Sequence, residues 1–161
     1  LAKNGQYVDS TVLFRKDRAW LFTLCMNPEK HSEGKFLRAE LLSEKELGKF
    51  EVIDEAGGLY RRPGGQFFAR GDKVYRVAQN CDGGYGRGLV FYLVGRCDGG
   101  GYEERKVKYI YSAEGFKMSK KKNYIGIHTY NECEDIQIID LKQKVFSIEE
   151  LVWRIRRKTG R

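Results

Sequence analysis

Residues 60–94 alternate apolar and polar side chains, and this pattern restricts the fold more than any other feature of the chain. The segment reads YRRPGGQFFARGDKVYRVAQNCDGGYGRGLVFYLV. A period of two buries one face of a β-strand, and glycine-rich breaks between such stretches favour antiparallel hairpins. Large polar side chains also recur among the apolar ones: Arg62, Arg76, Gln79, Asn80 and Arg87. We therefore expect an all-β chain whose polar groups gather at strand ends.

Strand–turn–strand patterns also occur on both sides of this segment. Residues 8–24 predict a hairpin around RKDR, residues 64–80 a hairpin around ARGDK, and residues 123–143 a third. Two further strands are expected over 86–94 and 104–112, separated by a glycine turn. Recurrence at a similar spacing is typical of sheets repeated around an axis.

Two segments carry helix patterns. In SEKELGKF, Ser43 and Glu46 have the spacing of a capping box, which predicts a short helix before Gly48. Ser147 and Glu150 repeat that spacing near the end of the chain, where apolar residues follow at helical intervals: Ile148, Leu151, Val152 and Ile155. We therefore predict a β-propeller-like domain over residues 1–146 and a C-terminal amphipathic α-helix with a basic tail over 147–161.

Length and composition favour one domain without a metal site or cofactor. The chain has 161 residues, 41% of them hydrophobic, which is enough for one sizeable core. No apolar run is long enough for a membrane span, and no signal peptide is recognisable. The four cysteines form no Cys-x-x-Cys pair. We therefore expect free thiols and a cytoplasmic location, although Leu1 in place of Met suggests sequence upstream.

The net charge of +8 favours acidic partners. Part of the positive charge falls in residues 117–123 and 154–161, where a solvated loop and tail explain it. Basic and aromatic residues do not interleave on one face, so nucleic acid is not the expected partner. A scaffold or nucleic-acid interaction protein that uses the basic tail is kept as an alternative.

Four stretches together resemble a known region: VDSTVLF, RPGGQFF, VYRVAQNCDGGYGRG and GIHTYN. They resemble the propeller-like region of plant glucosamine inositolphosphorylceramide transferases and of bacterial proteins that carry it, over about residues 7–140. Asn80 departs from the pattern, in which an Asp is expected. The three recurring hairpins predict about three antiparallel blades. A closed propeller needs at least four, so a longer chain or a homodimer would complete it.

That region is in turn similar to the five-bladed propellers of arabinanase- and xylosidase-type glycosidases. In those propellers acidic residues surround a central funnel, and Asp9 lies where one of them is expected. Where the resemblance implies a general acid, the sequence reads RRPGG, and the guanidinium of Arg62 cannot donate a proton at working pH. Standard two-carboxylate hydrolysis is therefore not expected. A hydrolase that combines Asp9 with another acid stays an alternative, and whether the chain is an enzyme is left open.

The remaining polar residues suit recognition of a carbohydrate. Guanidinium groups match phosphate or carboxylate, so Arg62, Arg76 and Arg87 favour an anionic glycan or sugar phosphate, unless they are solvated or form salt bridges. Gln79 and Asn80 suit sugar hydroxyls, and Tyr85 suits the face of a sugar ring. The alternative is that each of them only orders a loop. His128 is either structural or faces the ligand. We expect a carbohydrate-binding or carbohydrate-processing module linked to glycosyl transfer.

Overall fold

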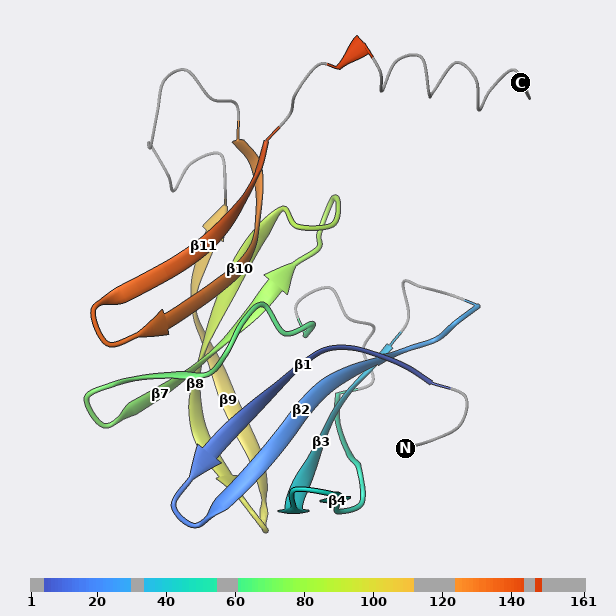
Figure 1. Cartoon of the computed structure of the whole chain (residues 1–161), viewed down its shortest axis with the longest axis vertical. Helices are drawn as coiled ribbons and strands as arrows, with labels where there is room; N and C mark the ends of the chain where they lie inside the picture. The colour runs from blue at the N-terminus through green and yellow to red at the C-terminus, as the bar shows by residue number, and fades with distance from the viewer. Residues whose placement is uncertain (1–4, 30–33, 55–60, 112–123, 144–146, 149–161) are drawn as a thin grey trace.

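The computed structural model describes residues 5–29, 34–54, 61–111, 124–143 and 147–148 (Figure 1). These residues form eleven strands arranged in three antiparallel sheets, which confirms the all-β class. The predicted C-terminal helix falls almost entirely on residues 149–161, outside the described part of the chain. Within the described residues, no helix is long and apolar enough to cross a membrane.

The first sheet contains the first predicted hairpin. Its strands are β1 (Gln6–Arg15), β2 (Arg18–Met26), β3 (Gly34–Ser43), β4 (Glu46–Leu47) and β5 (Glu51–Asp54). They follow the order β1-β2-β3-β4, and β5 also pairs with β3. Strands β1 and β2 are rich in β-branched and aromatic residues, which pack well on a pleated surface.

The helix predicted over residues 43–50 is wrong. Ser43 ends β3 and pairs with Glu46 at the start of β4, so the capping-box residues close a turn instead. The Ser43 hydroxyl oxygen accepts a hydrogen bond from the Lys45 amide at 3.3 Å, a local contact that serves turns as well as helix caps.

The other two sheets contain the remaining predicted strands. The central sheet has the order β6 (Phe68–Arg70), β7 (Lys73–Asn80), β8 (Gly88–Asp98) and β9 (Gly101–Tyr111). The third sheet pairs β10 (Tyr124–Cys133) with β11 (Ile136–Gln143). The second and third predicted hairpins, and the glycine turn between the two long strands, are confirmed.

The three hairpins share one turn design. Each has two loop residues, of which the first has positive φ and the second is an aspartate: Lys16-Asp17, Gly71-Asp72 and Glu134-Asp135. The positive φ values are 57° at Lys16, 62° at Gly71 and 50° at Glu134. Glycine adopts this conformation without the steric penalty that a Cβ atom brings, so the second hairpin has the favoured residue.

Replacing Lys16 with glycine is therefore expected to stabilise the protein. The substitution removes the penalty of a left-handed non-glycine residue, and the added flexibility of the unfolded chain offsets part of the gain. We expect a net increase of about 0.5–1 kcal/mol in the free energy of unfolding. Urea denaturation measures it, with Lys73→Gly, within a strand, as the control that should destabilise. A loss of stability in Lys16→Gly would contradict this account of the turn.

The central sheet packs between the other two (Figure 1). One of its faces meets the first sheet in a core formed by Leu13, Trp20, Phe22, Leu24, Phe36, Val94 and Cys97. The other face meets the third sheet through Phe68, Val77, Leu89, Phe91, Ile127 and Tyr130. Phe22 and Phe36 are fully buried, and each such side chain contributes about 1.5–3 kcal/mol by leaving water.

Candidate functional site

Two equivalent β-bulges provide the frame of the site. In the first sheet, Asp9 and Ser10 together oppose Thr23 between the regular pairs of β1 and β2. In the third sheet, His128 and Thr129 oppose Asp140 in the same way. A bulge redirects the side chains that it carries. Asp9 and His128 are each the first residue of their bulge, so they occupy corresponding places in the two sheets.

The two bulges are held by different groups. In the first sheet, the Ser10 hydroxyl donates to Thr23 Oγ1 at 2.9 Å. In the third sheet, one oxygen of Asp140 accepts the backbone N–H of His128 at 2.9 Å and that of Thr129. Partial burial of Asp140 opposes its charge, but these hydrogen bonds and His128 outweigh it and lower the pKa of its carboxyl.

The central sheet contributes through the segment before β6. The Arg62 carbonyl accepts the Gln79 amide at 2.8 Å, and the Gly64 carbonyl accepts the Tyr130 amide at 2.8 Å, so the segment links β7 to β10. Gly65 has a φ of 141°, and a Cβ atom there would lie 1.9 Å from the Tyr130 carbonyl oxygen. Only glycine fits at this position against β10, which explains the second glycine of RPGG.

Arg62 and Gln79 meet at Asp9. One carboxylate oxygen of Asp9 accepts hydrogen bonds from Arg62 Nε and from Gln79 Nε2, the latter at 3.0 Å. Gln79 is fully buried and also donates to the Pro63 carbonyl at 2.8 Å, while its own Oε1 has no partner in the described structure. The two terminal nitrogens of Arg62 make no hydrogen bond to the described residues, which leaves them available to a ligand.

Tyr85 connects Arg62 to the third sheet. Its hydroxyl is hydrogen-bonded to His128 Nε2, and its ring lies 5.0 Å from the Arg62 guanidinium carbon. His128 Nδ1 lies 3.1 Å from Asp140 Oδ2; if the imidazole is neutral, Nδ1 donates to Asp140 and Nε2 accepts from the tyrosine. Burial raises the pKa of Tyr85 despite the nearby Arg62, so the phenol is protonated at neutral pH.

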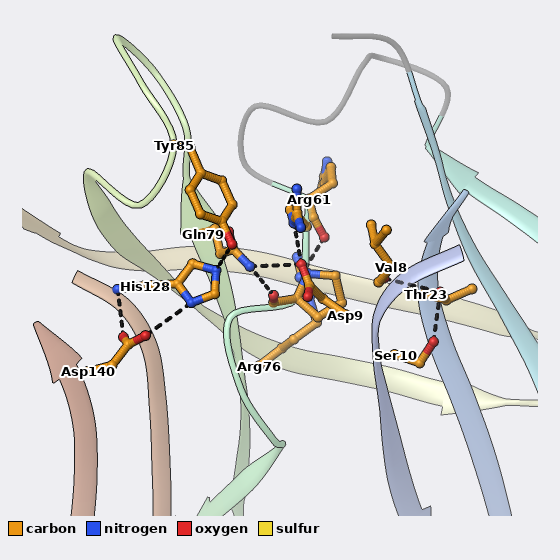
Figure 2. A network of polar contacts seen from close by, with 12 residues as sticks. Val8, Asp9, Ser10, Thr23, Arg61, Arg76, Gln79, Tyr85, His128 and Asp140 are labelled. Atoms are coloured by element: carbon orange, nitrogen blue, oxygen red, sulfur yellow. Dashed lines mark hydrogen bonds and ion pairs between the residues drawn. The ribbon is translucent and has the colours of Figure 1, made fainter. Parts of the chain in front are cut away.

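The six side chains form one polar cluster; five of them are labelled in Figure 2, where they lie between the strands of the first and third sheets. We use the name polar cluster for Asp9, Arg62, Gln79, Tyr85, His128 and Asp140. Tyr85 is 52% exposed, and Asp9, Arg62 and His128 are each partly exposed, so solvent reaches the cluster. Asp140 was missed by the sequence interpretation, because only the register of β10 and β11 places it opposite His128.

Arg76 is placed elsewhere, in the packing between the first and central sheets. Its side chain is fully buried, and its guanidinium lies 4.6 Å from each of the rings of Phe36 and Tyr92. Two of its nitrogens bind Glu104, each at 2.7 Å, and the third donates to the Arg61 carbonyl at 3.2 Å. Every nitrogen of this guanidinium is therefore used, which matches the salt-bridge alternative and not ligand binding.

Glu104 is the centre of this buried ion pair. It also accepts hydrogen bonds from the Tyr102 hydroxyl at 2.6 Å and from Arg61 at 2.7 Å. Burial disfavours the charge of Glu104, but Arg76 and these donors outweigh that effect and lower the pKa of the carboxyl.

Asn80 ends β7, and Arg87 lies in the following loop, which carries Tyr85. Asn80 is fully buried; its Oδ1 accepts the Asp82 amide at 2.9 Å, and its Nδ2 has no partner in the described structure. Arg87 is exposed and reaches only the Asp82 carbonyl, at 3.5 Å. Both residues order the loop, and neither side chain has a hydrogen bond or an ion pair with the polar cluster among the described residues.

The cysteine nearest the site does not suit nucleophilic chemistry. Burial raises the pKa of the Cys81 thiol, with smaller opposing effects from the Gly86 backbone and Arg62. A thiol with a raised pKa stays protonated at neutral pH and attacks poorly. All four cysteines are free: Cys25, Cys81, Cys97 and Cys133.

No family model, no curated protein and no solved structure matches this chain. The function must therefore be inferred from the residues and geometry of the site.

Proposed function

We propose that the polar cluster binds a carbohydrate, with an acidic glycan or a sugar phosphate as the preferred ligand. One observation carries the proposal: side chains from all three sheets meet in a continuous set of contacts that solvent can reach. Five of the eight residues predicted from sequence to form a site belong to it. They are Asp9, Arg62, Gln79, Tyr85 and His128.

The chemistry of the cluster suits a sugar. The half-exposed ring of Tyr85 offers an apolar face to a pyranose or furanose ring, and carboxylate and imidazole groups bind hydroxyls. The free terminal nitrogens of Arg62 match two oxygens of a phosphate or carboxylate. Because Asp9 balances part of that charge, we expect a moderate preference for acidic over neutral glycans.

We further propose that the three sheets are blades of a β-propeller. The repeated hairpin turns, the equivalent bulges and the face-to-face packing support this arrangement. Apolar residues on the outer faces of the end sheets are highly exposed, with values of 78% for Phe14, 64% for Ile136 and 62% for Ile138. Further blades from a longer chain, or a second copy in a homodimer, would cover these faces.

Binding is a better match to the cluster than two-carboxylate hydrolysis. Such hydrolysis needs one protonated carboxylic acid beside a carboxylate. Asp9 is held in an ion pair with Arg62. The lowered pKa of Asp140 makes that carboxyl a poor proton donor at neutral pH. Glycan turnover that disappears in Asp9→Asn would instead support the hydrolase alternative.

A glycan array with neutral, acidic and phosphorylated members tests the proposal. We expect the chain to bind a subset of acidic members, and Tyr85→Ala to abolish the signal because it removes both the ring and the hydroxyl beside His128. Phe14→Ala removes an exposed aromatic ring at the far face of the first sheet and should leave binding unchanged. No binding to any glycan, or equal binding by Tyr85→Ala, would contradict the proposal.

A further inference from the structure

A cavity of about 490 Å³ lies between the central and third sheets and shares no lining residue with the polar cluster. Its walls come from β6–β9 on one side and from β10 and β11 on the other. The lining residues are Phe68, Arg70, Tyr75, Phe91, Val107, Lys108, Ile110, Tyr130, Gln137 and Ile139. Small-molecule sites in proteins are cavities of this size, mostly apolar with a few polar groups.

Aromatic rings form one side of the cavity. Phe68 lies centrally: its ring centroid is 5.3 Å from that of Tyr75, 6.1 Å from that of Phe91 and 5.5 Å from that of Tyr130. Phe91 and Tyr130 also contact each other at 5.4 Å. These contacts hold the rings in place, so this part of the cavity is already formed without a ligand.

A β-bulge in β9 shapes the opposite side. Phe91 pairs with Lys108 and Tyr92 pairs with Lys106, so Val107 is an extra residue in the register. A bulge breaks the alternation of side chains, which explains why the consecutive residues Val107 and Lys108 both line the cavity. Val107 is 40% exposed although it is apolar.

The two cations of the lining differ in their partners. Arg70 binds Glu132 through Nε at 3.1 Å and Nη2 at 2.8 Å, and Nη2 lies 3.3 Å from the Tyr130 hydroxyl, so its charge is balanced. Lys108 is exposed and has no hydrogen bond or ion pair within the described part of the chain. The lining therefore combines a largely apolar interior with one unbalanced positive charge.

We propose that this cavity binds an amphiphilic carboxylate of the fatty-acid type, with its acyl chain against the aromatic rings and its carboxylate at Lys108. Burial of the methylene groups supplies the favourable free energy, and the ammonium group selects the charged head. A sugar would leave many hydroxyls without partners against this lining. The proposal is independent of carbohydrate binding at the polar cluster.

Fluorescence titration with dansylaminoundecanoic acid tests whether the cavity is the binding site. Val107→Trp fills the cavity and should weaken binding at least about tenfold, because buried methylene contacts are lost. Val52→Trp is the matched control, since Val52 is 48% exposed on β5 of the first sheet, and it should change the affinity less than twofold. An equal effect of the two substitutions, or no saturable binding to the wild type, would overturn the proposal.

Competition with undecanoic acid and undecanol tests the role of the charge. In the wild type the acid should displace the probe more effectively than the alcohol, by about two- to fivefold for an exposed ion pair. Lys108→Gln should remove this difference and leave displacement by the alcohol unchanged. Equal competition by both compounds in the wild type, or an unchanged preference in Lys108→Gln, would overturn the assignment of the carboxylate to Lys108.

Discussion

Glu104→Gln is expected to lower the free energy of unfolding by about 3–5 kcal/mol, because it leaves the charge of a buried arginine without its partner. Arg76 is fully buried, and Glu104 is 4% exposed. The glutamine is similar in shape and can still accept a hydrogen bond from Tyr102, so the loss reports mainly on the charge. Urea denaturation followed by tryptophan fluorescence measures it, since Trp20 lies in the core between the first and central sheets.

The loss of stability caused by Glu104→Gln should depend on pH. The pKa of Glu104 is lowered in the folded protein, so its contribution to stability is complete above the unfolded-state pKa of about 4.3. The contribution is lost as the pH falls through the folded-state pKa. The difference between wild type and Glu104→Gln should therefore shrink in acid. Glu103→Gln is the control, since Glu103 is 67% exposed and should change stability little at any pH.

Arg62→Ala is expected to weaken binding of the best glycan by about 1.5–3 kcal/mol, or roughly 10- to 150-fold, as for hydrogen bonds to charged groups. The substitution removes the nitrogens available to an acidic ligand and the group that orients Asp9. It also removes the cation beside the Tyr85 ring. Isothermal titration calorimetry with a glycan selected from the array measures the loss.

Arg87→Ala is the matched control for this experiment. Arg87 lies in the same loop as Tyr85 and carries the same charge as Arg62. Among the described residues it is hydrogen-bonded only to the Asp82 carbonyl. If only net charge mattered, both substitutions would weaken binding equally. An Arg62→Ala protein that is folded by circular dichroism and binds like wild type would exclude Arg62 from the site.

The strands and hairpins could be predicted because the residues that determine them are close together in the sequence. Each turn, such as Gly71-Asp72, lies between short apolar stretches, and antiparallel neighbours pair with the next segment of the chain. The helix predicted at Ser43 is absent because the Ser43–Glu46 spacing is compatible both with a helix cap and with a tight turn between two strands. Pairing of Leu41 with Leu47 across the turn extended the first sheet instead, a tertiary effect that propensity does not contain.

The site was predicted only in part, because its contacts join distant segments. Asp9 and Arg62 were each singled out, but their pairing depends on how the first and central sheets pack. Asp140 became recognisable only when the register placed it opposite His128. For Arg76, the sequence pattern could not distinguish a ligand-facing guanidinium from one buried against Glu104.

Chemical-shift mapping tests the central claim that the polar cluster is the carbohydrate site. The glycan with the strongest array signal is titrated into isotope-labelled protein, and backbone amide shifts are followed. We predict that the largest changes occur at Asp9 and His128 in the two bulges, at Gln79 in β7 and at Tyr85 in the loop that follows β7. Saturable changes confined to β9 and β11, with these four amides unmoved, would contradict the claim.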